Sequence, residues 1–179
     1  MPYGEYVIWQ KDVLSALWDI TGPGGAIFYN HKPQIRQGRC LLPTELVPEV
    51  AILRQVLIWD RGGGVNHSPG FFTPVCEWIL ILAHQSWALL NRGAGYRGDV
   101  WRLAIDTGTA PHPCAYPTDL PKRALEATGA QTILDPFMGS GTTLRAAKDL
   151  NRKSIGIEIE EKYCEIAANR LSQEVFDFT

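Results

Sequence analysis

The segment from residue 132 to residue 171 constrains the fold more than any other part of this chain. Its pattern predicts a strand at 132–135, a helix at 141–150, a strand at 154–158 and a helix at 161–171. Strands that alternate with helices form βαβ units, which have parallel strands and a right-handed crossover. We therefore predict an α/β fold with a parallel sheet in this part of the chain.

The turn between the first of these strands and its helix is rich in glycine. It reads Asp-Pro-Phe-Met-Gly-Ser-Gly-Thr-Thr over residues 135–143. Gly139 and Gly141 allow a sharp turn and close approach of the backbone to a ligand. Free N–H groups at a helix start favour an anion, and Asp135 at the carboxyl end of its strand can take an ammonium group. One turn can thus hold both ends of an amino acid.

A second acidic residue follows at the end of the next strand. Glu158 lies 23 positions after Asp135, a spacing that suits an acceptor for both hydroxyls of a ribose. An amino acid beside a ribose describes S-adenosylmethionine. A dinucleotide fingerprint is weaker, because Leu144 stands at its third glycine, and a phosphate-binding P-loop lacks its lysine. A tight turn without a ligand remains the alternative.

Three segments resemble motifs of the DNA amino-methyltransferases, which methylate N6 of adenine or N4 of cytosine. Residues 135–143 resemble cofactor motif I, Gly156-Ile157-Glu158 resembles motif II, and residues 112–117 with Leu120-Pro121 resemble motif X, which closes over the methionine end of the cofactor. The cofactor-binding residues that this resemblance implies are Asp135, Pro136, Phe137, Gly139, Gly141, Thr142, Thr143, Glu158, His112, Pro113 and Tyr116.

Motif X lies just before motif I, which is the permuted order of the β group of this family. The resemblance implies a Rossmann-like methyltransferase sheet in permuted order, S-adenosylmethionine as cofactor and double-stranded DNA as partner. It also implies a place in DNA methylation, in a restriction–modification system or a phage or prophage. We expect one domain over 1–179, with the rest of the catalytic half at 5–90, a target-recognition insertion at 91–110 and the cofactor half at 111–179.

The catalytic motif of the family, of the type Asp/Ser-Pro-Pro-Tyr, is not found in this sequence. Tyr3 in Pro2-Tyr3 is the one candidate for a degenerate form, and no other catalytic residue is identified. The resemblance places the strand that feeds this motif in the centre of the sheet, so we expect either direct pairing of the two flanking halves or an unstable fragment. An inactive remnant that still binds cofactor is one alternative function, and an RNA or small-molecule methyltransferase is another.

The first half of the chain has a weaker pattern. It predicts an amphipathic helix at 5–20 that buries Trp9 and Leu14, and buried strands at 26–30, 52–59 and 78–83. The segment 91–102 is expected to be an inserted hairpin or loop outside the core. Six cations can contact phosphates or form a solvated loop surface, with equal weight: Lys32, Arg36, Arg39, Arg92, Arg97 and Arg102. The tryptophans Trp59, Trp78 and Trp87 are expected in the core.

Composition excludes several classes of protein. A formal charge of −2 gives no support to a wholly basic nucleic-acid binder. Four scattered cysteines without a C-x-x-C pair argue against zinc and indicate reduced thiols. There is no signal-peptide pattern and no apolar run long enough to span a membrane, so we expect a cytoplasmic protein. The sequence does not indicate an oligomeric state.

We expect this chain alone not to methylate DNA. In the family the catalytic motif holds the target amine in line with the methyl group, and correct orientation provides much of the rate. The measurement is transfer of a labelled methyl group to mixed-sequence DNA, for this chain and for a chain extended upstream by an Asp/Ser-Pro-Pro-Tyr segment. Only the extended chain should be active; equal turnover by both would show that Tyr3 or another segment serves as the catalytic loop.

Overall fold

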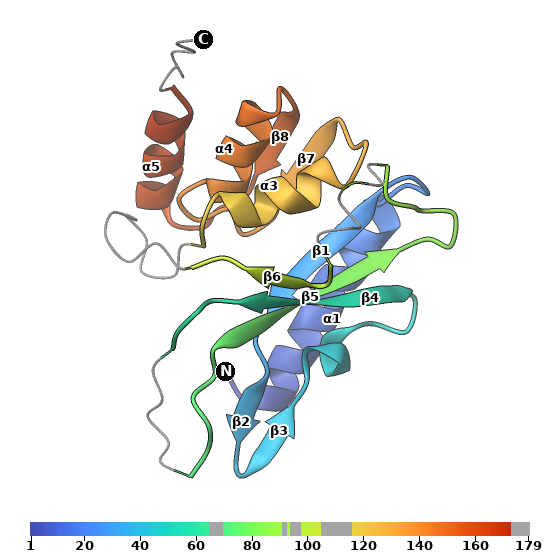
Figure 1. Ribbon diagram of the computed structural model, residues 1–179, viewed down its shortest axis with the longest axis vertical. Helices are drawn as coiled ribbons and strands as arrows, with labels where there is room; N and C mark the ends of the chain where they lie inside the picture. Colours follow the sequence, from blue (N-terminus) through green and yellow to red (C-terminus); the bar gives the residue numbers. More distant parts are fainter. Residues whose placement is uncertain (65–69, 91–92, 94–97, 105–115, 173–179) are drawn as a thin grey trace. The chain divides into compact units, whose positions relative to one another are not determined.

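A computed structural model describes residues 1–64, 70–90, 93, 98–104 and 116–172 of the chain (Figure 1). The chain divides into two compact units, Met1–Leu103 and Ala104–Thr179. Each unit is described by itself below. The single methyltransferase domain expected from the sequence remains a prediction.

The first unit is built on a mixed sheet of four strands with the order β1-β5-β4-β6. Its elements are α1 (Tyr3–Ile20), β1 (Ala26–His31), β2 (Gln34–Arg36), β3 (Arg39–Leu41), the 3-10 helix η1 (Pro43–Leu46), β4 (Leu53–Asp60), β5 (Cys76–Ala83) and β6 (Val100–Arg102). β5 runs antiparallel to both β1 and β4, and β6 runs parallel to β4. The carboxyl ends of β1, β4 and β6 therefore lie on the same side of the sheet, at the edge where these strands end.

The core of this unit lies between the sheet and α1. Leu14 of α1 packs against Leu80 and Leu82 of the central strand β5, and all three are buried. The predicted buried face of the helix is wrong at one position: Trp9 is 40% exposed, whereas Gln10 is only 7% exposed. Gln10 can be buried because its side-chain amide donates to the Tyr6 hydroxyl and accepts from the Tyr29 hydroxyl.

Two expectations for this unit are corrected. The segment of Lys32, Arg36 and Arg39, which was considered above as a loop surface, contains a hairpin, in which β2 pairs antiparallel with β3. The triplet Val100–Arg102 belongs to the main sheet and not to an inserted loop, since it pairs with β4 and buries Trp101 to 6% exposure. A strand of three residues beside glycines and arginines has too short a pattern to be distinguished from a loop. Residues 91–92 and 94–97 of the predicted insertion lie outside the described residues.

The tryptophans of the first unit are only partly as expected. Trp59 is a core residue, and its indole N–H donates to the carbonyl of Leu103 at 2.7 Å. Trp78 and Trp87 are half-buried. Arg102 is exposed and forms a 3.6 Å ion pair with Asp60 at the shared edge of β4 and β6.

The second unit follows the predicted alternation of strand and helix. It contains α3 (Asp119–Glu126), β7 (Thr132–Asp135), α4 (Thr142–Asp149), β8 (Lys153–Gly156) and α5 (Glu161–Ser172). β7 and β8 pair in parallel, with Asp135 opposite Gly156 at their carboxyl ends, which confirms the predicted βαβ unit. A small core of Leu125, Ile133, Ala146 and Ala147 joins α3, β7 and α4.

Strand pairing is described within each unit. Among the described strands, β1 is paired only with β5, and β7 only with β8. The expectation of either direct pairing of the two halves or an unstable fragment stays a prediction. The described residues also contain no helix long and apolar enough to cross a membrane.

Replacing Leu82 with alanine should lower the free energy of unfolding by about 2–5 kcal/mol, because the vacated volume lies in the core between α1 and the sheet. Leu90→Ala is the matched control: Leu90 is 73% exposed, and its loss should change stability by no more than about 0.5 kcal/mol. Urea unfolding followed by circular dichroism measures both. Similar losses in the two variants would contradict this placement of the core.

Candidate functional site

The candidate site is the turn that follows β7, together with the chain that follows β8. Hydrogen bonds continue past the ends of the two strands: the Ile157 N–H donates to the Asp135 carbonyl at 2.9 Å, and the Met138 N–H donates to the Ile157 carbonyl at 3.0 Å. β8 itself ends at Gly156, two residues earlier than predicted. The continued bonding nevertheless holds Glu158 beside the turn.

Two glycines give the turn its shape. Gly139 and Gly141 have φ angles of 49° and 79°, in the left-handed region that other residues enter at a cost. The Gly141 N–H closes the turn on the Met138 carbonyl at 2.8 Å, and α4 starts at the next residue. A Cβ on Gly141 would lie 2.9 Å from the Cβ of Ala167. Gly141 is therefore required by the backbone angle and by the packing of α5.

Glu158 connects the ends of the two strands through its carboxylate. Oε2 accepts from the Gly139 N–H at 3.0 Å, and Oε1 accepts from the N–H groups of Ile159 and Glu160, each at 2.9 Å. A carboxylate offers about four acceptor positions, so at least three are occupied by the backbone of the protein. Glu158 thus stabilises the glycine turn from the neighbouring strand.

Asp135 is held by a short chain of hydrogen bonds. Its Oδ1 accepts from the Phe137 N–H at 3.1 Å, and its Oδ2 accepts from the Tyr116 hydroxyl at 3.3 Å. The Tyr116 oxygen also lies 2.7 Å from Oγ1 of Thr143. One consistent set of protons has Thr143 donating to Tyr116 and Tyr116 donating to Asp135. Burial, and then the nearby Asp135 carboxylate, raise the pKa of Tyr116, so the phenol stays protonated at neutral pH.

The sequence did not single out Arg170 or Ile159. The Arg170 guanidinium donates to Oγ1 of Thr142 and to Oγ1 of Thr118, both at 3.1 Å, and so joins α5 to the start of α4 and to the segment before α3. Burial, and then the nearby Arg145, lower the pKa of Arg170 from its ordinary value. Ile159 directly follows Glu158 and is 96% exposed. Arg170 lies three positions after the buried Ala167, a helical spacing that could have indicated it.

The structure brings several predicted residues together within the second unit. Tyr116, Asp135 and Thr143 are connected by hydrogen bonds, and so are Gly139 and Glu158. The remaining described ones, Pro136, Phe137, Gly141 and Thr142, lie along the same turn. His112 and Pro113 lie outside the described residues.

Tyr3, the candidate for a degenerate catalytic motif, belongs to the first unit. It is the first residue of α1, and the Arg36 guanidinium lies over its ring, 5.4 Å from the ring centroid. In the described part of the chain, no group of three or more His, Cys, Asp or Glu residues is arranged to hold a metal ion.

Solved structures resemble this chain in fold. The cytosine-N4-specific PvuII DNA methyltransferase superposes with a TM-score of 0.81 at 16% identity, over 97% of this chain and 73% of that chain. The protein TTHA0409 of Thermus thermophilus, solved in complex with S-adenosyl-L-methionine, superposes with a TM-score of 0.72 at 24% identity, over 98% of this chain and 80% of that chain. The fold is thus the α/β fold of the S-adenosylmethionine-dependent methyltransferases.

Sequence comparison identifies the family. The model of the DNA methylase family, which covers N6- and N4-methyltransferases, matches residues 2–169, and the chain belongs to this family. The type II methyltransferase M.BglII of Bacillus subtilis is 28% identical over 97% of this chain and 59% of its own length. M.HpaI of Haemophilus parainfluenzae is 43% identical over 49% of this chain and 29% of its own. The resemblance seen in the motifs is confirmed, and this chain spans less than two thirds of M.BglII.

Replacing Gly141 with alanine should destabilise the protein by at least about 1–2 kcal/mol, the cost of a left-handed angle in a residue with a Cβ. Crowding against Ala167 adds to this cost. Gly24→Ala is the control, because Gly24 has no left-handed φ and its Cβ would meet nothing within 4 Å. Thermal unfolding compares the two; equal midpoints would show that the turn tolerates a side chain at 141.

Proposed function

We propose that the second unit binds S-adenosylmethionine at the glycine turn, as the cofactor half of an enzyme that methylates an exocyclic amine of double-stranded DNA. The observation that carries this proposal is the pair of carboxylates at the ends of adjacent parallel strands. Asp135 and Glu158 flank the turn, and Glu158 is bonded to it through Gly139. Ligands of open α/β sheets bind at this edge.

The groups around the glycine turn suit the ammonium, carboxylate and adenine parts of S-adenosylmethionine. Two of the four acceptor positions of Asp135 are used by Phe137 and Tyr116, which leaves capacity for an ammonium group. The first N–H groups of α4 suit the carboxylate of an amino acid. The exposed side chains of Phe137 and Ile159 offer apolar surface for an adenine ring. His112 and Pro113 belong to the proposed site through the motif alone.

The Glu158 carboxylate suits the hydroxyls of a ribose, but most of its acceptor positions are already in use. Since at least three of its acceptor positions are already occupied, both hydroxyls of a ribose can be accepted only if a backbone bond is exchanged. The bond from Gly139 is the one that joins it to the turn. We therefore propose that ribose binding and the local shape of the glycine turn are coupled through Glu158.

When bound, S-adenosylmethionine supplies a methyl group on a sulfonium centre. The residues of this chain bind and orient it: the Thr143–Tyr116 pair holds Asp135 in place, and Arg170 holds Thr142 at the start of α4. The acceptor would be N6 of adenine or N4 of cytosine in a base turned out of the duplex. A cytoplasmic location is part of this proposal, because that is where bacterial DNA lies.

The proposal extends to a restriction–modification system, because M.BglII and M.HpaI are described as type II methyltransferases. A prophage origin rests on no similar support. The comparisons do not favour the alternative of an inactive remnant. The assignment of individual residues to the cofactor remains part of the proposal.

Glu158→Gln should weaken binding of S-adenosylmethionine about tenfold or more. The amide cannot accept on both sides, and a hydrogen bond to a charged group contributes roughly 1.5–3 kcal/mol. Calorimetry measures the affinity, and thermal unfolding shows whether the loss of the Gly139 bond has unfolded the unit.

The control is Glu165→Gln, which makes the same change on an exposed position of α5 and should leave the affinity as it was. Unchanged affinity in a folded Glu158→Gln protein would refute the ribose assignment. Failure of the unaltered chain to bind S-adenosylmethionine would refute the proposed cofactor site itself.

A further inference from the structure

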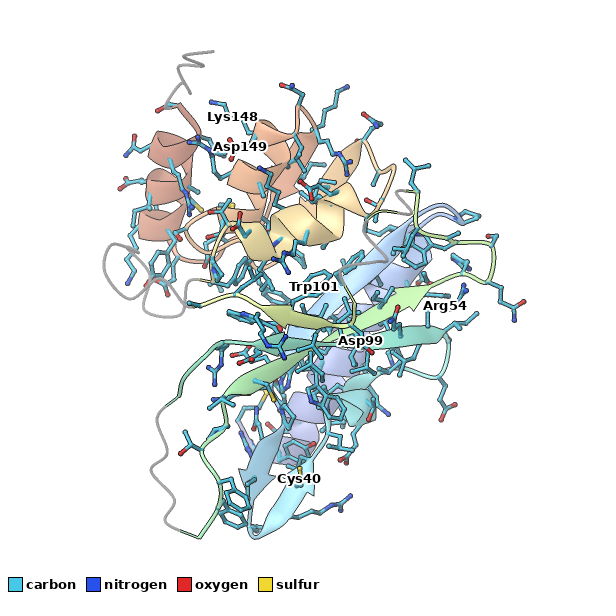
Figure 2. All side chains as sticks on the ribbon, viewed as in Figure 1. Cys40, Arg54, Asp99, Trp101, Lys148 and Asp149 are labelled. Carbon is cyan, nitrogen blue, oxygen red and sulfur yellow. The ribbon has the colours of Figure 1, made fainter. Side chains whose placement is uncertain are left out.

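The hairpin formed by β2 and β3 is the most basic acid-free segment of the first unit. Between Lys32 and Thr44 the chain has three cations, Lys32, Arg36 and Arg39, and no acidic residue, although the whole chain has a formal charge of −2. Figure 1 shows β2 and β3 beside each other, apart from the four-stranded sheet, and the label of Cys40 marks β3 in Figure 2. Its charge is therefore local and opposite in sign to that of the whole protein.

The geometry of the hairpin places two of these cations directly opposite each other. Gln37 and Gly38 have φ angles of 50° and 76°, as in the tight two-residue turn that joins twisted strands. Arg36 pairs with Arg39 across this turn. Like charges at directly opposed positions destabilise a strand pair. The folding of the hairpin alone thus gives no reason for two arginines here.

The surrounding residues neutralise this charge only weakly. Arg39 lies 3.5 Å from Glu45, but their side chains are 74% and 36% exposed, and exposed pairs of this kind contribute little. Among the described residues, the hydrogen-bond acceptor of Arg36 is the neutral Gln34, at 3.0 Å from Nε. The fork of Arg36 therefore keeps donors for an external acceptor.

The position of the hairpin also suits contact with a large anion. It leaves the sheet after His31, at the carboxyl end of β1, and β4 and β6 end at the same edge. The start of α1 lies at this edge too, because the Tyr6 hydroxyl is 2.7 Å from Nε2 of His31. The Arg36 guanidinium lies over the Tyr3 ring, which restrains it in an exposed position.

We propose that the β2–β3 hairpin contacts the phosphate backbone of duplex DNA through Arg36 and Arg39. This inference rests on the proposed function, since it names how the same enzyme would hold its DNA. Guanidinium groups bind phosphate oxygens with two-point hydrogen bonds, and a phosphate anion near both arginines reduces their mutual repulsion. Such contacts position the duplex and carry no sequence preference.

The experiment is fluorescence anisotropy of a labelled mixed-sequence duplex with the unaltered 179-residue chain and its variants, over about 50–200 mM salt. Arg36→Gln and Arg39→Gln should each weaken binding uniformly across sequences and reduce the slope of log K against log salt by about 1. Arg39→Lys should retain the slope, because it keeps the charge.

The matched control is Arg54→Gln. Arg54 lies near the start of β4, away from the edge that bears the hairpin, and donates to the carbonyl of His84 (Figure 2). The Arg54→Gln substitution removes one positive charge from the same unit, as the hairpin variants do, and should leave the salt slope unchanged. Thermal unfolding of the hairpin variants should show no loss of stability, because each removes one of two repelling charges.

The outcomes distinguish the proposals. Hairpin variants with an unchanged salt slope would overturn the hairpin proposal and leave DNA binding in place. If the chain binds S-adenosylmethionine in calorimetry but binds no duplex at any salt concentration, the hairpin proposal is overturned and the proposed cofactor site stands. Tighter binding of single strands than of duplex, with the same dependence on Arg36 and Arg39, would overturn the choice of duplex DNA.

Discussion

The second unit depends on the parallel pairing of β7 with β8 and on its continuation past the strand ends. Parallel neighbours end at the same edge, so their pairing brings Asp135 and Glu158 to the two sides of one turn. The bonds from Ile157 and Met138 and the bond from Gly139 to Glu158 then hold that turn to the next strand. Each contributes only about 0.5–1.5 kcal/mol, or more where a carboxylate accepts. Together they determine where α4 begins.

Side chains from distant positions complete this arrangement. Tyr116 reaches Asp135 and Thr143, and Arg170 reaches Thr118 and Thr142, so the segment before α3, the start of α4 and the end of α5 are joined around the turn. Buried hydroxyl and guanidinium groups need such partners, because an unpaired buried polar group is costly. The same bonds restrict the orientation of the carboxylate proposed to receive the cofactor's ammonium group.

The first unit shows where sequence patterns become insufficient. Three of its strands, β1, β4 and β5, were predicted to within two residues of their bounds. The clearest of them, β5, is a continuous apolar run that is buried at every residue from Ile79 to Ala83. The hairpin and β6 were missed, since each strand has only three residues and its pairing partner is remote or separated by a special turn. Gln10 is buried where Trp9 was expected, because two tyrosines from different elements form hydrogen bonds with its side-chain amide. Local hydrophobic periodicity does not indicate such bonds.

By itself, the sequence determined the alternation of strand and helix over 132–171, the glycine turn, the two acids and the family to which the chain belongs. The alternation, the turn and the two acids follow from local composition and spacing, which act over a few residues, whereas the family was indicated by the resemblance of the motifs. Only the tertiary structure decided that Glu158 is already bonded to Gly139, that Arg170 ties α5 to Thr142, and that Arg36 faces Arg39 across a hairpin. Those contacts join residues that are distant in the chain or depend on a strand register, and their geometry arises only when the packed elements bring the partners together.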